Sequence, residues 1–203
     1  MTLNYNDSRV MKPILIIILT FFFYSSFSQT VEELEHELSF YKSGEKWGNK
    51  KDIAYKLLVT DGLNNKAINY LVEVFGRNNQ RDSISALFDK TIERNPDNPK
   101  IYLIRANERN AHFAGLTFTQ RINYLKKAKV LDKENIEATY SLGKTYYELF
   151  VREFKNNKKK VNLDHYAKSA TDYFTDLLSI GEKFKETTKY PLIQLYNYFR
   201  QKC

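Results

Sequence analysis

Apolar residues along this chain recur at spacings of three and four, the period of one face of an α-helix. The pattern is clear at Val31, Leu34, Leu38 and Tyr41, and it returns in every later segment. No stretch alternates apolar and polar residues over the length of a strand. The pattern predicts helices at about residues 31–41, 50–60, 65–75, 84–94, 100–114, 120–131, 136–151, 165–184 and 191–200.

Turn-forming residues separate these segments. Asn95-Pro96-Asp97-Asn98-Pro99 ends one helix, because proline lacks a backbone donor and restricts the residue before it. A polar insert, Arg152–Asp164, is expected to separate two later helices, and Pro191 is expected to open the last one. No pair of helices carries enough apolar surface to stand alone. We therefore expect an all-α fold in which antiparallel helix pairs stack into an α-solenoid.

Residues 1–28 have the pattern of a secretory signal peptide, with Met11 as an alternative start. Positive charge precedes the apolar run Ile14–Phe23, and small residues at Ser26–Ser28 offer a cleavage point. The run is about half of the roughly 20 residues that a membrane-spanning helix needs. The sequence thus predicts an exported chain, periplasmic or secreted. The alternative is a chain held in the inner membrane by an uncleaved N-terminal segment.

The composition narrows the classes of partner. A net charge of +8 is compatible with an anionic partner. An exported protein, however, meets envelope polymers and lipid headgroups more often than nucleic acid, so no nucleic-acid partner is expected. The basic run Lys155–Lys160 is either a contact for an anionic surface or a solvated loop, and the second interpretation is favoured. The single cysteine, Cys203, excludes an internal disulfide framework and a Cys-based zinc site.

The sequence predicts no enzyme. His36, His112 and His165 are far apart and lack further ligands at metal spacing. No glycine-rich phosphate loop, nucleophile elbow or zinc-hydrolase helix is present. We therefore expect no catalytic residue, no metal and no cofactor.

Two short motifs carry a resemblance to a known family. Leu142-Gly143-x-x-Tyr146 resembles the core of the first helix of tetratricopeptide repeats, and Leu71-Val72-x-x-Phe75 occupies the same positions earlier in the chain. The turns at Asn95–Asn98 and Asp132–Asn135 are similar to the turn of that family. Their positions Pro96 and Lys133 lie 37 residues apart, against a family period of about 34.

The resemblance implies how the helices pack. Gly143 and Ala106 would allow close approach between helices, while Tyr146 and Phe75 would fill the space within a pair. On second helices, Ala128, Ala170 and Phe174 would take the family's small and aromatic positions. The chain departs from the pattern at Arg105 and Arg109, which stand where core Leu and Tyr are expected.

On this basis the chain divides into residues 29–64, an N-terminal helical pair; residues 65–180, the repeats; and residues 181–203, a capping helix. The resemblance also implies a ligand groove along the first helices, suited to an extended peptide or protein partner. The oligomeric state is left open, and simple exposure of these side chains is the alternative interpretation. The groove residues predicted by helical phase are Asn69, Tyr70, Glu73, Arg77, Leu103, Asn107, Asn110, Tyr140, Lys144 and Tyr147.

Overall fold

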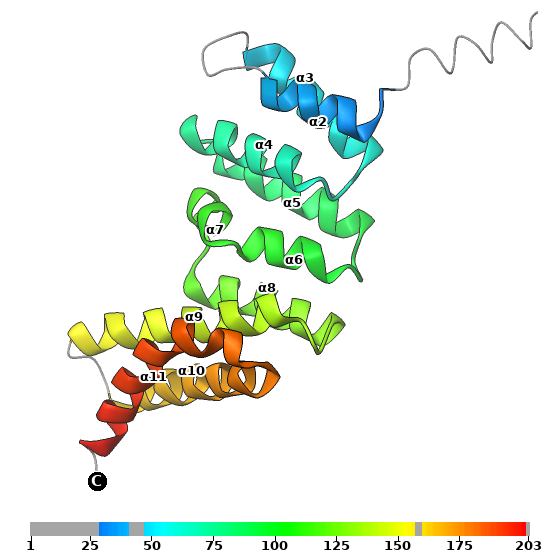
Figure 1. Cartoon of the computed structure of the whole chain (residues 1–203). Helices are drawn as coiled ribbons and strands as arrows, with labels where there is room; N and C mark the ends of the chain where they lie inside the picture. Colours follow the sequence, from blue (N-terminus) through cyan, green and yellow to red (C-terminus); the bar gives the residue numbers. More distant parts are fainter. Residues whose placement is uncertain (1–28, 41–46, 157–159, 202–203) are drawn as a thin grey trace, which may run out of the picture. The chain divides into compact units, whose positions relative to one another are not determined.

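The structure is a computed structural model that describes residues 29–40, 47–156 and 160–201. Every regular element in these residues is helical, with ten α-helices, one 3-10 turn and no strand, which confirms the all-α class for this part of the chain (Figure 1). The expected signal peptide, residues 1–28, lies outside the described residues. The chain divides into two compact units, Met1–Asp61 and Gly62–Cys203.

The first unit contains a pair of helices, α2 (Val31–Phe40) and α3 (Trp47–Thr60). Thr30 and Glu33 form a capping box at the start of α2: the Glu33 backbone N–H donates to Thr30 Oγ1, and the Thr30 N–H donates to Glu33 Oε2. Leu34 of α2 and Ile53 and Leu57 of α3 are buried in the small core between the two helices.

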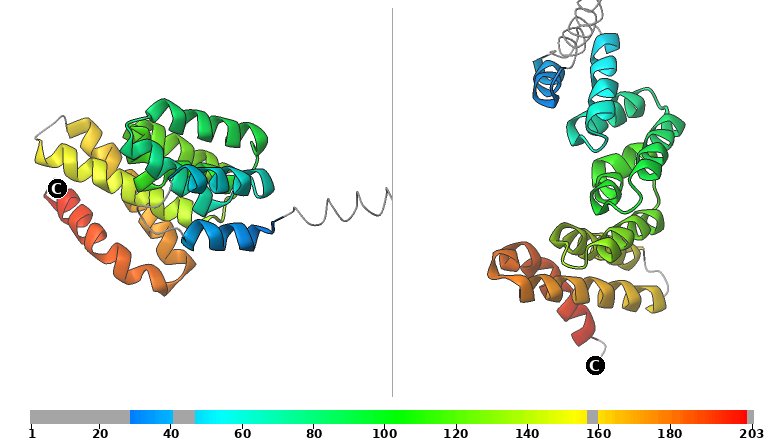
Figure 2. Two further views of the ribbon diagram at one scale, coloured as in Figure 1. Left: turned by 90° about the horizontal axis from the view of Figure 1, so that it is seen from above. Right: turned by 90° about the vertical axis from the view of Figure 1, so that its right-hand side faces the viewer.

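The second unit contains the other helices, and most of them pack against near neighbours in the chain. The contacts run from α4 to α5, from α6 to α8, from α8 to α9 and from α9 to α10, and α11 lies against α10 (Figure 2). The elements are α4 (Asn65–Arg77), α5 (Arg81–Arg94), α6 (Pro99–Ala106), α7 (Glu108–Ala114), α8 (Phe118–Leu131), α9 (Ile136–Lys155), α10 (Lys160–Ile180), the 3-10 turn η1 (Glu182–Phe184) and α11 (Lys185–Arg200).

Helices α9 and α10 approach each other closely at Gly143. A Cβ atom built on Gly143 would lie 2.8 Å from ring carbons of Phe174, closer than unbonded carbons approach. Leu142, Tyr146 and Phe174 are buried around this contact. The positions expected to form the core therefore do so in this pair.

The expected single helix at residues 100–114 is wrong, because the chain breaks at Asn107. The backbone of Asn107, with φ −51° and ψ 139°, leaves the helical region, so α6 ends at Ala106 and α7 begins at Glu108. The Asn107 side chain accepts a hydrogen bond from the Arg109 N–H at 3.1 Å. Asparagine favours this N-cap geometry over the helix interior, and its side chain supplies the acceptor that α7 needs.

Two expectations about the C-terminal region are also wrong. The described parts of the insert at Arg152–Asp164 are mainly helical, because α9 continues to Lys155 and α10 begins at Lys160. Pro191 lies inside α11 and does not open it. The carbonyl that loses its donor there belongs to Thr187, an exposed residue, so water can satisfy it.

Candidate interaction surface on the first helices

The ten predicted groove residues all lie in the second unit, but they differ in exposure. Asn110 is 1% exposed and Leu103 is also buried, so neither side chain is open to a partner. Arg77 and Asn107 are exposed, and the remaining six are half-buried. Asn107 caps α7, which gives it a structural role. Apart from Asn107, only Arg77 and the six half-buried ones among the ten predicted residues are therefore accessible enough to form a binding surface.

Contacts between α4 and α7 use three of these residues. Asn110 Nδ2 donates to Asn69 Oδ1 at 3.1 Å and to the Ile104 carbonyl at 2.7 Å, which satisfies an acceptor at the end of α6. On the same side, Glu73 accepts hydrogen bonds from the guanidinium groups of both Arg77 and Arg109. One carboxylate therefore holds α7 against α4.

A second set of ionic contacts joins α7, α8 and α9. Lys144 Nζ lies 2.7 Å from Glu108 Oε2 and 3.8 Å from Glu148 Oε1, and Arg121 Nη1 lies 3.2 Å from Glu148 Oε2. The hydrogen bond from Lys144, followed by its charge, lowers the pKa of Glu108. The same hydrogen bond is the main cause of the raised pKa of Lys144. Arg121 also donates to the Ala106 carbonyl at 2.9 Å, beside the break at Asn107.

Tyr147 of α9 connects the predicted groove to the C-terminal helix. Its hydroxyl donates to Gln194 Oε1 of α11 at 2.5 Å, and Gln194 Nε2 in turn donates to the Tyr190 hydroxyl. Burial, followed by the proximity of Tyr190, raises the pKa of Tyr147. Helix α11 therefore covers the hydroxyl end of Tyr147 and removes it from the open surface.

These contacts join residues of α4, α7, α8 and α9 into a set that we call the inter-helix polar cluster. Most of its members hold neighbouring helices in place, whereas Arg77 bonds to Glu73 within α4. The cluster can make hydrogen bonds and ionic contacts through its amide and charged groups. It consists of Asn69, Glu73, Arg77, Glu108, Arg109, Asn110, Arg121, Lys144 and Glu148.

The repeat pattern predicts core positions for both Arg105 and Arg109, and only Arg105 is buried. Arg109 was expected in a core position, but the break at Asn107 moves it to the surface beside Glu73. The signal for this was Asn107 followed by Glu108, an N-cap with an acidic first turn. Arg105 is buried as expected of its position. Its guanidinium carbon lies 4.5 Å from the centre of the Tyr124 ring, and Nη1 lies 2.6 Å from Asp89 Oδ1.

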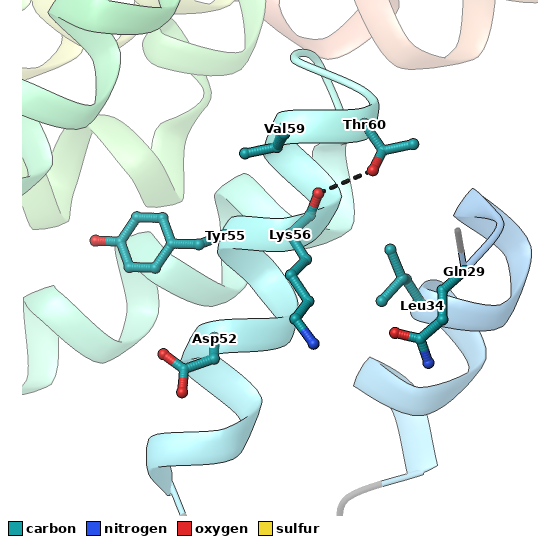
Figure 3. A pocket seen from close by; sticks show the side chains of 7 residues that line it. All are labelled: Gln29, Leu34, Asp52, Tyr55, Lys56, Val59 and Thr60. Carbon is teal, nitrogen blue, oxygen red and sulfur yellow. Dashed lines mark hydrogen bonds between the residues drawn. The ribbon is translucent and has the colours of Figure 1, made fainter. Parts of the chain in front are cut away.

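A pocket of about 550 Å³, which the sequence pattern does not predict, lies in the first unit (Figure 3). It is open to solvent, because Val59 on its wall is 82% exposed. The Thr60 hydroxyl is bonded to the Lys56 carbonyl of its own helix at 3.1 Å and is not directed at a ligand. The lining residues are Gln29, Leu34, Asp52, Tyr55, Lys56, Val59 and Thr60.

Within the described residues, no three His, Cys, Asp or Glu side chains gather at metal-binding geometry. None of the helices at residues 31–40, 47–155 or 160–200 is long and apolar enough to cross a membrane.

Comparison with known proteins adds no relative. No family model, curated protein or solved structure matches this chain.

Proposed function

We propose that this protein is an exported, tetratricopeptide-like interaction module whose helix pairs stack as an α-solenoid. It binds an extended peptide or protein segment along the face formed by α4, α7 and α9. Three things support this proposal: the repeat motifs, the nearest-neighbour packing of the helices, and the close approach at Gly143. The N-terminal apolar segment supports export.

The observation that carries the proposal is the inter-helix polar cluster. Its ion pairs fix the first helices relative to one another before any partner arrives, which reduces the entropy lost on binding. Arg77 of α4 is exposed and Tyr140 of α9 is half-exposed, and the hydrogen bond of Arg77 to Glu73 stays within α4. A guanidinium and a phenol ring are also the side-chain types that most often dominate interface energies.

The test compares two double variants of the full chain expressed in cells. Arg77→Ala with Tyr140→Ala removes the proposed contacts, while Asn123→Ala with Lys127→Ala removes two exposed residues of α8 as a matched control. Asn107 is left unchanged because it caps α7. After crosslinking and affinity capture, mass spectrometry quantifies the co-purified proteins.

We expect the first variant to lose its principal partner by roughly tenfold or more, the effect of about 1.4 kcal/mol, and the control to retain it. Circular dichroism should show equal helix content in both. Equal capture by the two variants would place the binding surface elsewhere on the molecule.

A second candidate function is a structural envelope protein anchored by residues 1–28, which the apolar run Ile14–Phe23 favours. Cell fractionation with mass spectrometry of the N-terminus separates the two. A soluble chain that begins at Gln29 contradicts anchoring, whereas a membrane-bound chain that retains residues 14–23 supports it.

A further inference from the structure

Helix α11 exposes an aromatic and aliphatic face on the side away from its own core. Thr188 and Leu195, which face inward, are fully buried. On the opposite side, Tyr190 is 65% exposed, Ile193 is 50% exposed and Tyr196 is 66% exposed. Three large apolar side chains on one exposed helix face form a patch of the kind that marks an interaction site.

The residues of this face have the spacing of a helix-packing seam. Glu186, Tyr190, Ile193, Asn197 and Arg200 follow one another at intervals of four, three, four and three. Such an alternation keeps one stripe of a helix facing a partner helix over several turns. All five residues are exposed, so the stripe is accessible along its full length.

The charges at the two ends of the stripe are complementary under a two-fold axis. Glu186 and Arg200 each lie seven positions from Ile193, and Tyr190 and Tyr196 each lie three positions from it. When two copies of α11 pack antiparallel with the axis at Ile193, Glu186 of each copy meets Arg200 of the other. A parallel pair would instead bring Glu186 against Glu186 and Arg200 against Arg200, which is repulsive.

We propose that α11 is a self-association surface on which α11 of a second copy packs antiparallel around Ile193. Such an interface is isologous, as in most homodimers. The Gln194 hydrogen bond to the Tyr190 hydroxyl, together with that of Tyr147 to Gln194, holds one ring of the surface in place from α9. The proposal is independent of peptide binding, because its surface contains none of the residues altered in the partner-capture experiment.

The interface is small. Two tyrosines and an isoleucine from each copy bury on the order of 400 Å² per copy, or about 800 Å² in total. That area is at the low end for protein interfaces and corresponds to a weak, reversible dimer. Its detection therefore needs a method that traps transient contacts at the concentration found in the cell.

Disulfide trapping in the full chain meets that need. The background carries Cys203→Ser, so that each variant has a single engineered thiol. Ile193→Cys places two thiols at the proposed axis, where a disulfide needs Cα atoms about 4.4–6.8 Å apart. Thr187→Cys is the matched control, because Thr187 is exposed on α11 but lies outside the stripe. After mild oxidation of cells, non-reducing gels quantify the covalent dimer.

We expect Ile193→Cys to give at least fivefold more covalent dimer than Thr187→Cys. Co-expressed Tyr190→Cys and Tyr196→Cys chains should crosslink to each other more than either does to itself, which distinguishes antiparallel from parallel packing. Equal dimer yield at positions 193 and 187 would overturn the proposal. Self-crosslinking of Tyr190→Cys that exceeds the mixed product would overturn the antiparallel arrangement.

Charge reversal supplies a second test that does not alter the apolar residues. In the Ile193→Cys background, Glu186→Arg should lower the dimer yield severalfold, because it places four cationic groups at the two ends of the interface. Adding Arg200→Glu should restore the yield, since the pairs reform with reversed sign. Failure of the double reversal to restore the dimer would contradict the ion pairs in the proposal.

Discussion

At the scale of single residues, Gly143 sets the distance between α9 and α10. Its missing side chain leaves room for the buried ring of Phe174, and a Cβ atom at this position would also lie 3.3 Å from Cβ of Tyr173. Because Phe174 is enclosed by its neighbours, its ring cannot move aside without disturbing other contacts. We expect Gly143→Ala to destabilise the fold by about 1–3 kcal/mol, which thermal or urea unfolding will measure.

Gly181 provides the matched control for this substitution. No atom lies within 4 Å of a Cβ built there, and its φ of 170° is ordinary extended backbone. Gly181→Ala should therefore leave stability unchanged or raise it slightly. Phe174→Leu should recover part of the loss in the Gly143→Ala chain. Equal stability of the Gly143→Ala and Gly181→Ala variants would contradict the close contact between Gly143 and Phe174.

Arg105 shows a different relation between residue and core. Its guanidinium lies between the rings of Phe88 and Tyr124, with centroid distances of 5.5 and 4.5 Å, and its Nε is buried without a hydrogen-bond partner. Asp89, its ionic partner, is 65% exposed, so the pair is only partly desolvated. The apolar stem and the ring contacts therefore contribute more than the ion pair.

Two substitutions at position 105 separate these contributions. Arg105→Met keeps the length of the side chain and removes the unsatisfied donor, so its stability should lie within about 1 kcal/mol of the parent. Arg105→Ala leaves a cavity between Phe88 and Tyr124 and should cost about 2–3 kcal/mol. Chemical denaturation of both variants provides the measurement. A large loss in Arg105→Met would instead assign the stabilisation to the charge.

At the scale of elements, the break at Asn107 shows what the apolar pattern alone can predict. The periodicity located most of the helical segments, because burial of one face dominates helix formation in a protein. It did not locate the break, since Ala106, Asn110 and Ala111 continue to be buried on both sides of it. The break depends instead on a cap and on two side chains, Asn110 of α7 and Arg121 of α8, that satisfy the carbonyls freed at the end of α6.

The cap itself is testable. Asn107→Ala should destabilise the chain by about 1 kcal/mol, because the Arg109 N–H loses its acceptor and alanine favours a continuous helix that the packing of α7 on α4 opposes. Asn107→Asp should retain most of the stability, since it keeps the acceptor. Melting temperatures of the two variants will show this. A stabilised Asn107→Ala chain would contradict the break.

The contact between α7 and α9 makes stability depend on pH. Lys144 lowers the pKa of Glu108 in the folded chain. The contribution of this ion pair to folding stability is therefore fully present above the unfolded pKa of about 4.3, and it is lost as the pH falls through the folded pKa. Both side chains are substantially exposed, which limits the contribution to about 0.5 kcal/mol. Glu108→Gln should therefore melt slightly below the parent at pH 7 and together with it near pH 3.

A control variant assigns this effect to the pair. Lys144→Met should lower the folding stability at pH 7 by the same amount as Glu108→Gln. Adding Glu108→Gln to the Lys144→Met chain should lower the stability little further. Lys144→Met also removes the contact of Lys144 with Glu148, so the effect of Glu108 is measured by comparing Lys144→Met with and without Glu108→Gln. A difference between parent and Glu108→Gln that persists near pH 3 would show that the loss comes from altered packing.

At the scale of the whole molecule, the candidate surface was harder to predict than the fold class. Helical phase assigns each predicted groove residue to a helix, but it could not show that Glu73 and Lys144 bind other residues of the same chain. It also placed Leu103 and Asn110 on the surface, since it assumed that one straight helix runs through Asn107. Pairing across helices depends on three-dimensional proximity, which the spacing of a single helix does not contain.

The division of the chain at Asp61 and Gly62 leads to a prediction about folding. In residues 62–203, helices α4 to α11 pack against one another and the inter-helix polar cluster lies within the same unit. The first unit has only the small core of α2 and α3, and chains below about 40 residues rarely fold without a disulfide, a metal or a partner. A fragment of residues 62–203 should therefore unfold cooperatively and retain its helix content, whereas residues 29–61 alone should be largely unfolded.

Circular dichroism and thermal melts of the two fragments will test this prediction. Residues 62–156 serve as the control, because that fragment exposes Gly143 and the apolar face of α9 by removing Phe174 and the rest of α10. It should lose cooperativity or aggregate, since the loss of α10 leaves the apolar face of α9 exposed to water. A fragment of residues 62–203 that melts without cooperativity would mean that the first unit is needed to complete its core.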